Sequence, residues 1–545
     1  MGMNWKMAAG LLLVSTLAAG NAQTTTNDQS AKGSSAQRME NGSIEAQIQE
    51  LRKAMDAQRA QIDRLEQQLA ERDMEAREKQ QASGSDAVEA LQKQQEKLTA
   101  EVQHPDALHY KGITLSPHGS FIEAATVYRS AATGGGINTA LTGVPLEQSD
   151  AAQISEFVGS GRQSRLALRA TGELYNMKLT GYYEMDWLGT GITSNNNQSN
   201  SYVLRQRQLW AQARLSSGWT FTGGQMWSLA TETTQGMENG TEILPGTIDP
   251  QYTAGFVWAR QYGFRVAKGF RNKFWLGASA ENAETLNPAG SNLPTNLLIG
   301  SSGTGGGLYN STANYSFNLA PDMVAKAVWE PGWGHYELFG LARFFRNRIY
   351  PAGTSSAGAY NDSTVTGGVG GGFRVPLADK KFSLGLKGLW GEGTGRYGDS
   401  TIADITLRPD GQIAPLRAFS ALGTLEASAT KRLSLYFNYG GDYVYRRYWG
   451  DVGYGSPLTN MTGCNTEPVP GGSFSPGAPA DCSGNNKDVQ EITSGYWYDF
   501  YSGAKGRLRQ GIQYSYIERN LWSGIGGSAK GDDNIFETSF RYYLP

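Results

Sequence analysis

The residues best suited to binding or catalysis are charged side chains, several of which are spaced two or four residues apart. They are Arg165, Arg169, Lys178, Glu184, Asp186, Arg205, Arg207, Arg507, Arg509 and Arg541. Residues two apart in a β-strand point to the same face of a sheet. If these segments are neighbouring strands, the cations gather on one surface, where they would raise the local concentration of anions.

A catalytic interpretation of the same residues is weaker. Glu184 and Asp186 share one strand face and could act as an acid and base pair, but charge that lines a cavity is the commoner reason for such a pair. None of the four histidines lies in a zinc-binding His-Glu-x-x-His pattern, and serine-nucleophile and phosphate-loop motifs are absent from the sequence. We therefore expect no enzyme activity, no metal and no cofactor.

The elements that must position these side chains are long strands. Between Arg432 and Arg446, apolar and aromatic residues alternate with polar ones, with Tyr436 and Val444 as exceptions. This two-residue period predicts a β-strand. Strands of soluble domains have about 5–6 residues, whereas a tilted membrane-crossing strand needs roughly 9–11. A strand of this length with one apolar face is typical of a transmembrane β-barrel.

The connections between such segments alternate between short turns and long polar loops. We predict about 16 antiparallel strands, at 117–129, 161–172, 175–187, 202–214, 218–229, 257–268, 273–281, 313–330, 335–345, 365–375, 381–391, 417–429, 432–446, 489–501, 506–518 and 534–545. Outer-membrane barrels have an even number of strands, short periplasmic turns and long outer loops. The predicted fold class is an all-β transmembrane β-barrel over residues 104–545. A soluble β-sandwich or propeller is the alternative, but those folds do not separate short from long connections in this way.

Three segments precede the predicted barrel. Residues 1–22 contain Lys6, an apolar run and a small-x-small cleavage site, which indicates a secretory signal peptide. Residues 23–42 are polar and expected to be disordered. In residues 43–103, apolar positions from Ile44 to Leu69 alternate steps of four and three, which predicts an α-helical coiled coil in the periplasm. An isolated solvated helix is the alternative, and the pattern does not decide between two and three strands.

The charge and hydrophobic composition of the chain exclude some classes of partner and of membrane segment. A net charge of -2 over 545 residues argues against a nucleic-acid partner. Beyond the N-terminal segment, no apolar run reaches the roughly 20 residues that a membrane-spanning helix needs.

The only cysteines, Cys464 and Cys482, bracket a loop rich in Gly, Pro, Ser and Asn. In an exported chain this pair suggests a disulfide that closes a surface loop, and two free thiols are the alternative.

The apolar face of each strand decides which charges point into the barrel. Leu166 and Leu168 would face lipid, which places Arg165 and Arg169 inside. The same reasoning places the other charged residues named above inside, although Leu209 shares a face with Arg205 and Arg207. Because closure brings the last strands beside the first, these cations are predicted to form one basic wall. Acidic residues of the third long loop are predicted to face it at a constriction, namely Glu232, Glu238, Glu242 and Asp249. Alternatively, the arginines pair with interior carboxylates and only make the barrel rigid.

Several short stretches resemble the DcaP-like outer-membrane porins. In chain order they are Arg162-Gln163-Ser164-Arg165-Leu166, Glu184-Met185-Asp186, Leu204-Arg205-Gln206-Arg207, Gly224-Gln225-Met226-Trp227-Ser228 and Pro321-Asp322. The resemblance covers the chain from about Ile44 to the end. It implies a trimer of 16-stranded barrels, a third loop folded into the pore, and a preference for small anionic solutes such as dicarboxylates. The cysteine-closed loop and the ending Leu544-Pro545 depart from what we expect of the family.

From these observations we expect an outer-membrane porin of a Gram-negative bacterium. It would be a passive channel for ion transport and for small hydrophilic, anionic solutes, in contact with outer-membrane lipid and assembled as a homotrimer. The alternative is a structural anchor, in which a plugged barrel is linked to the periplasm through the coiled coil.

Overall fold

The structure is a computed structural model that falls into two units, Met1–Gln103 and His104–Pro545. It describes residues 107–189, 202–286, 288–300, 316–467 and 482–545, together with Arg64 and Gln68, which are exposed helical residues of the first unit. The predicted signal peptide, polar segment and coiled coil lie outside the described residues, apart from these two. No helix in the described part of the chain is long and apolar enough to cross a membrane.

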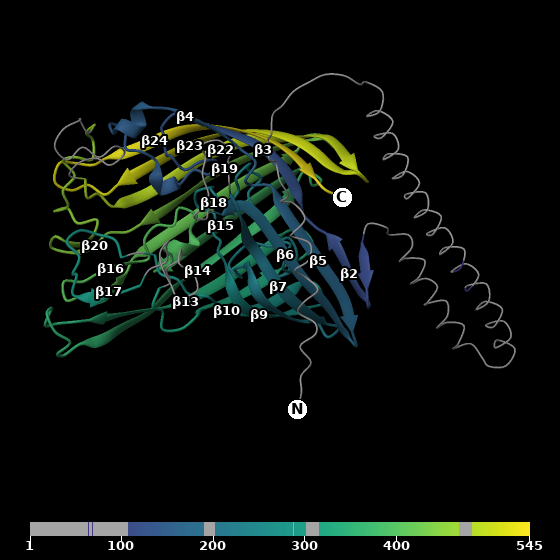
Figure 1. Ribbon diagram of the computed structural model, residues 1–545, viewed down its shortest axis with the longest axis horizontal. Coiled ribbons are helices and arrows are strands. Elements are labelled where there is room, and N and C mark those ends of the chain that lie inside the picture. The colour runs from purple at the N-terminus through teal and green to yellow at the C-terminus, as the bar shows by residue number, and fades with distance from the viewer. Residues whose placement is uncertain are drawn as a thin grey trace, which may run out of the picture. The chain divides into compact units, whose positions relative to one another are not determined.

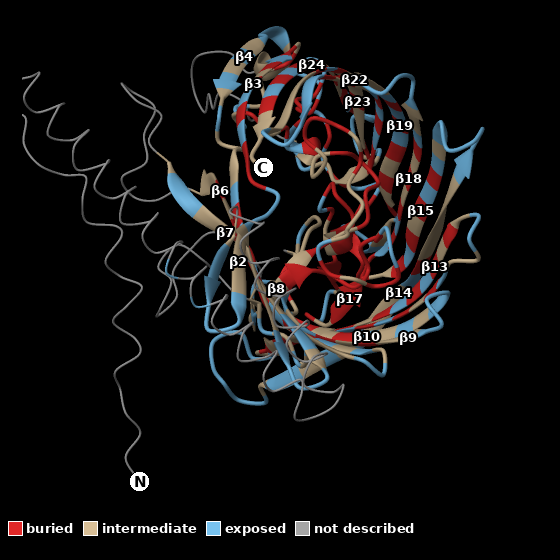
Figure 2. Ribbon diagram, turned by 90° about the vertical axis from the view of Figure 1, so that its right-hand side faces the viewer, coloured by how far each residue is buried: buried red, intermediate tan, exposed pale blue. Residues whose placement is uncertain are grey.

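Sixteen long strands in the described part of the second unit form a closed antiparallel β-barrel (Figures 1 and 2). They are β3 (Phe121–Arg129), β5 (Arg165–Leu174), β6 (Met177–Gly189), β7 (Val203–Leu215), β8 (Trp219–Trp227), β9 (Arg260–Phe270), β10 (Phe274–Glu281), β12 (Asp322–Trp329), β13 (His335–Ile349), β14 (Tyr360–Leu377), β15 (Phe382–Glu392), β18 (Arg417–Ser428), β19 (Leu433–Val444), β22 (Asn486–Gly503), β23 (Gly506–Leu521) and β24 (Lys530–Tyr543). Each strand pairs with its neighbour in the chain, and β24 pairs with β3 to close the barrel.

Shorter elements extend the barrel or lie in its connections. The short strands are β1 (Leu108–Tyr110), β2 (Ile113–Pro117), β4 (Glu156–Ser160), β11 (Leu297–Leu298), β16 (Ile405–Leu407), β17 (Ile413–Pro415), β20 (Arg447–Trp449) and β21 (Val452–Tyr454). Three 3₁₀ turns are η1 (Leu141–Gly143), η2 (Asp150–Gln153) and η3 (Gly395–Tyr397). β2 and β4 pair with the first long strands and lengthen the first hairpin.

The prediction of sixteen antiparallel strands is confirmed, and each predicted segment overlaps one observed strand. The largest boundary differences are at β12, which begins at Asp322 rather than residue 313, and β14, which begins at Tyr360 rather than residue 365. Short turns and long connections alternate as predicted, for example at the β18–β19 turn and the β8–β9 loop. We call the end with the short turns the turn side and the opposite end the loop side.

Burial follows the same period of two. On β13 every odd-numbered residue from His335 to Ile349 is buried, and the even-numbered residues are half-buried or exposed. Figure 2 shows the same alternation as bands of buried and less buried positions along the strands, and it shows many buried positions in the segments that the wall surrounds. Exposed apolar residues, such as Phe437, Phe536 and Phe540, lie on the outside. A sheet closed on itself has no free edge and presents one apolar face to lipid.

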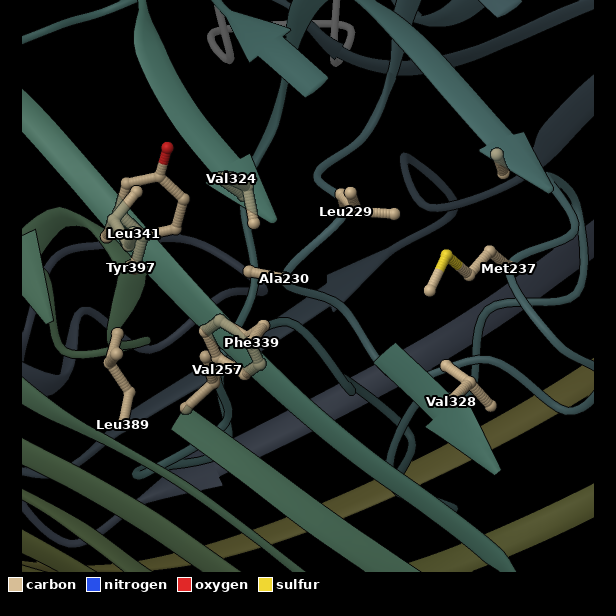
Figure 3. Packing of buried hydrophobic residues seen from close by; sticks show 12 residues of the cluster. Leu229, Ala230, Met237, Val257, Val324, Val328, Phe339, Leu341, Leu389 and Tyr397 are labelled. Atoms are coloured by element: carbon tan, nitrogen blue, oxygen red, sulfur yellow. The ribbon is translucent and has the colours of Figure 1, made fainter. Parts of the chain in front are cut away.

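Part of the interior is packed with apolar side chains. Residues 228–259 connect β8 to β9, and we call them the inward loop. Leu229, Met237 and Val257 of this loop pack against residues of β12, β13 and β15, such as Val324, Phe339 and Leu389 (Figure 3). Tyr397, from the connection between β15 and β18, belongs to the same cluster. The lumen is therefore filled along β12 to β15, and open space is left on the opposite side.

Candidate solute pathway

The inward loop is fixed to one side of the barrel by its backbone. Its amide groups at Ile248, Ala254 and Gly255 donate to Gln513, Glu491 and Asp442, at 2.7, 2.8 and 3.0 Å. These acceptors lie on β23, β22 and β19, and we call β18, β19, β22 and β23 the far wall. Backbone N–H groups without a strand partner must bond elsewhere when buried, so these side chains hold the loop in place. The near wall, β3 and β5 to β9, faces the other side of the loop.

Two cavities lie between the inward loop and the near wall. The loop-side cavity has a volume of about 630 Å³ and is lined by Arg165, Arg205, Arg207, Arg260 and Arg541 together with Asp186, Asp249 and Asp399. The turn-side cavity has a volume of about 310 Å³ and is lined by Arg165, Arg169, Lys178 and Arg214 together with Glu184, Glu238 and Glu242. Gly119, Arg165 and Leu244 line both. The two cavities therefore meet at Arg165, which belongs to the near wall, and at Leu244, which belongs to the inward loop.

A break in the first hairpin places Arg165 at this point. β3 and β5 pair at one position only, Phe121 with Arg165. On either side of this pair, hydrogen bonds from serine side chains replace the missing backbone hydrogen bonds. Ser120 Oγ accepts from Ala167 N at 2.8 Å and donates to Ala167 O at 3.1 Å. Glu123 N donates to Ser164 Oγ at 3.0 Å. Hydroxyl groups that both donate and accept can replace backbone partners in this way.

A β-bulge in β7 places Arg207 in the lumen. Glu184 pairs with Gln208 and Met185 pairs with Gln206, which leaves Arg207 as the extra residue. Gln225 Nε2 donates to the freed carbonyl oxygens of Gln206 and Arg207, at 3.2 and 2.9 Å. Gly224, with φ +130°, allows the close approach, since a Cβ there would lie 2.2 Å from Leu209 O. The bulge shifts the alternation by one residue. It explains how Leu209 points outward although the sequence puts it on the face of Arg205 and Arg207.

Most predicted pore-lining charges are paired across the near wall. Arg207 donates to Glu184 Oε1 at 2.5 Å and to Asp186 Oδ2 at 2.9 Å, and Arg205 donates to Asp186 Oδ2 at 2.7 Å. Arg541 donates to Glu123 Oε1 at 2.8 Å and contacts the inward loop at Ile248 O at 2.5 Å. Arg165 is looser, with its Nε 3.7 Å from Glu184. Arg169 contacts His118, and Lys178 lines the turn-side cavity.

Arg260, which is not among the predicted pore-lining residues, differs from the other arginines of the loop-side cavity, each of which lies near a carboxylate. It has no direct hydrogen bond or ion pair among the described residues, and its guanidinium lies 5.2 Å from the ring of Trp227 and 5.9 Å from that of Trp258. Tyr262 and Phe264 of the same strand are exposed on the outside, so strict alternation would place Arg260 on the lipid face. Arg260 is the first residue of β9, and it lines the loop-side cavity all the same. In the sequence, the spacing of two residues between Trp258 and Arg260 was the pattern that could have indicated that both side chains share a face.

The four predicted carboxylates of the inward loop have different surroundings. Glu238 and Glu242 line the turn-side cavity, where Glu238 forms an ion pair with Arg214 at 2.6 Å. Asp249 lines the loop-side cavity and accepts from Asn138 at 2.5 Å. Glu232 lies away from both cavities and binds Arg374 at 2.9 Å. The loop thus presents three of the four carboxylates to the near wall.

Burial changes the titration of two of these groups. Glu242 and Asp249 lie outside the spanning strands, and burial raises the pKa of each to about 7. Desolvation disfavours the charged carboxylate, and the nearby arginines only partly offset it. The charge of the loop therefore changes near neutral pH.

Arg507 and Arg509 do not belong to this passage. Both form ion pairs with Asp499, at 2.6 and 3.0 Å, and line a separate chamber beside the far wall. The inward loop separates this chamber from the near wall, since Trp497 Nε1 donates to Gly246 O at 2.9 Å. The order of the strands around the barrel does not predict that Arg507 and Arg509 are separated from the near wall. The separation arises because the inward loop crosses the lumen between the two groups of cations.

The two cysteines are joined by a disulfide on the loop side. Cys464 and Cys482 have an S–S distance of 2.10 Å. Cys464 is buried among Leu146, Met461 and Leu521, so the bridge fastens the β19–β22 connection to its neighbours. The described residues contain no group of three or more His, Cys, Asp or Glu side chains arranged to hold a metal.

No protein-family model and no curated protein sequence matches the chain. Solved structures match its architecture. The outer membrane channel DcaP of Acinetobacter baumannii is 15% identical, with a TM-score of 0.54 over 80% of this chain and 99% of that chain. The chain has the fold of this channel. The resemblance that the short motifs indicated is confirmed at the level of the fold.

Other solved structures of outer-membrane proteins are weaker matches. The anion-selective porin from Comamonas acidovorans is 11% identical, with a TM-score of 0.42 over 79% of this chain and 99% of that chain. OmpT, an outer membrane protein of Vibrio cholerae, is 11% identical, with a TM-score of 0.38 over 81% of this chain and 100% of that chain.

Most of the stretches that resemble the DcaP-like porins come together in the near wall. Arg162 stacks on Tyr202 at 3.6 Å, and Glu184, Asp186, Arg207 and Gln225 meet at the bulge of β7. Asp322 lies apart and accepts from Arg343 at 3.1 Å. These stretches therefore lie mainly in the near wall and do not surround one binding pocket.

Proposed function

We propose that the protein is an outer-membrane porin, a passive channel for small hydrophilic solutes with a preference for anions. The observation that supports this most strongly is the charge of the loop-side cavity, where five arginines face three aspartates. One of the arginines, Arg260, has no direct partner among the described residues. Cations lining a narrow passage beside low-dielectric walls attract anions and lower their entry barrier. No reaction is proposed.

The assembly and location belong to the same proposal. The exposed apolar belt would contact outer-membrane lipid, with the short turns in the periplasm and the long connections outside the cell. The heptad pattern of residues 43–103 supports a coiled coil in the periplasm that helps to join three barrels into a homotrimer. The solute class, small anions, follows from the charge of the passage.

A structural anchor is the second candidate, and one observation favours it. The inward loop and the residues around Tyr397 fill much of the lumen with buried apolar side chains. If the remaining cavities do not connect, the barrel is a plugged support for the periplasmic segment. Conduction separates the two candidates, because a plugged barrel carries no current.

The test is single-channel recording of the purified full-length protein in a planar bilayer under a KCl gradient. Current steps in groups of three and a reversal potential of anionic sign are expected. The double variant R165Q/R169Q should move the reversal potential towards that of a non-selective pore, because both cations line the passage. The matched control is R346Q/R348Q, since both arginines lie on the outward face of β13, where Arg348 donates to Asn361 at 3.0 Å.

The outcomes separate the alternatives. A cation-selective current would keep the channel and reject the anion preference. Absence of current from folded, inserted protein would favour the anchor. An equal shift in both double variants would show that general surface charge, rather than the passage, sets the selectivity.

A further inference from the structure

A third cavity, which we call the far-wall chamber, lies on the turn side of the inward loop. Its volume is about 370 Å³, and it is formed by the turn-side ends of β15, β18, β19, β22 and β23. Leu244 and Gly246 of the inward loop form part of its lining, and Trp497 holds Gly246 through the 2.9 Å hydrogen bond to its carbonyl oxygen. The chamber is thus covered by a fixed part of the loop, and the turn between β14 and β15 borders it.

The chamber is cationic. Lys380, Lys381, Arg507 and Arg509 line it against one carboxylate, that of Glu426. Glu426 lies 3.8 Å from Arg374, which is itself bound to Glu232 at 2.9 Å. Asp499 is shared between the two arginines of the chamber. Neither lysine has an ion pair among the described residues. The carboxylates near the chamber therefore already have cationic partners, and the lysines leave an excess of positive charge.

Neutral donors accompany the cations. Ser383, Ser428 and Ser434, whose side chains carry hydroxyl groups, line the same chamber. Ammonium and guanidinium groups with hydroxyls are the usual ligands of oxyanions, which have many acceptor oxygens. A volume of about 370 Å³ is within the range of small-molecule sites, at its lower end. This combination favours a compact anion with several charges over a single halide ion.

The chamber also adjoins the proposed passage. Leu244 lines the far-wall chamber and both cavities of the near wall. An anion that leaves or enters the turn-side cavity therefore meets the chamber next to Leu244. The near wall and the far wall offer it two separate groups of cations, one on each side of the inward loop.

We propose that the far-wall chamber is a binding site for polyvalent oxyanions at the turn-side mouth of the pore. Lys380 and Lys381 supply its unpaired charge, and Arg507 and Arg509 supply directed hydrogen bonds. The inference rests on the proposed channel only for the route by which the anion reaches the chamber.

Inorganic pyrophosphate is the probe. Added to the turn side of full-length channels in KCl, it should reduce the current in a saturable way, and less from the loop side. K380Q/K381Q should raise the half-blocking concentration roughly fivefold, the effect of losing two exposed charge contacts. The matched control is K431Q/R432Q, which removes two charges from the neighbouring β18–β19 turn, whose residues do not line the chamber. The control should leave the half-blocking concentration unchanged.

Calorimetric titration of pyrophosphate into the detergent-purified proteins measures the same site without conduction. Weaker binding in K380Q/K381Q alone supports the site. Equal weakening in both double variants, or none in either, overturns it. A cation-selective reversal potential in KCl with intact pyrophosphate binding would reject the anion preference of the passage and leave the chamber standing.

Discussion

Arg260 illustrates how a single side chain obtains a role from its surroundings. Its guanidinium lies against Trp227 and Trp258, and no carboxylate among the described residues contacts it directly. Arg207, in the same cavity, is bound by Glu184 and Asp186. An arginine that is paired with carboxylates mainly stabilises the wall. The charge of an unpaired arginine remains available to attract an anion. The selectivity of the passage should therefore depend more on Arg260 than on Arg207.

The first prediction concerns this residue. R260Q should lower the ratio of anion to cation permeability roughly twofold, because one screened charge contributes about 0.5 kcal/mol. Reversal potentials under a salt gradient measure the ratio, and R348Q, at the outer end of β13, is the control. An unchanged ratio in R260Q would show that the charge of Arg260 does not contribute to the selectivity.

A second prediction concerns pH. Glu242 and Asp249 have pKa values raised to about 7 by burial, from ordinary values of 4.5 and 3.8. As pH falls from about 8 to about 6, both groups take up protons, the loop loses negative charge, and anion selectivity should rise. The same shift makes the folded loop less stable as pH rises through 7, since the folded state binds these protons more tightly than the unfolded state.

Reversal potentials recorded across this pH range test the prediction. E242Q/D249N should show high anion selectivity at every pH in the range. E147Q is the control, because Glu147 lies in the exposed part of the first long connection and pairs with Lys530 at 3.1 Å. A profile in E242Q/D249N identical to that of the unmodified protein would assign the pH response to other groups.

At the scale of elements, the inward loop depends on close packing against the far wall. Gly255 has φ +81°, and a Cβ there would lie 1.9 Å from Ala421 O and 2.6 Å from Gly441 N. Its amide donates to Asp442 at 3.0 Å. A side chain at this position cannot fit unless the loop moves away from β18 and β19, towards the near wall.

The third prediction follows. G255A should reduce single-channel conductance and lower stability by roughly 1–3 kcal/mol, the usual cost of overpacking. G353A is the matched control, because Gly353 also has a positive φ, +69°, but has nothing within 4 Å of the added Cβ. Conductance and thermal unfolding of both variants should be compared. If G353A loses as much conductance as G255A, backbone strain rather than displacement of the loop is the cause.

At the scale of the whole molecule, we propose different roles for the barrel and for the N-terminal segment. The barrel is closed by β24 pairing with β3 and contains its own packed interior. The heptad pattern of residues 43–103 predicts contacts between chains. Association should therefore depend on the heptad seam even though the barrel folds around its own core.

The fourth prediction tests this separation. L65D places a charge in the predicted seam and should shift the purified protein from trimer towards monomer, while heat-modifiable mobility of the barrel is retained. Q68D is the control, because Gln68 is an exposed helical residue off the seam. Mass photometry of both variants measures the distribution. A trimer that persists in L65D would place the subunit contacts in the barrel.

The number, order and polarity of the strands could be predicted because they depend on a local signal. Alternation of apolar and polar residues is required wherever one face meets lipid and the other meets water or a packed interior. The exceptions in the stretch from Arg432 to Arg446 have a structural cause. Tyr436 packs against Ile248 of the inward loop, and Val444 packs against Ile402 and Leu416 of the β15–β18 connection. Inward positions are apolar where loops cover them.

The sequence by itself determined the strand set, the inward face of most charged residues and the identity of the long connections, since each follows from a period of two and from turn composition. Only the tertiary structure decided which cations share a cavity. Arg507 and Arg509 are separated from the near wall by a loop distant in sequence, the bulge at Arg207 shifts the alternation, and Arg260 enters the lumen at a strand end. These features depend on contacts between segments far apart in the chain, which a local pattern does not contain.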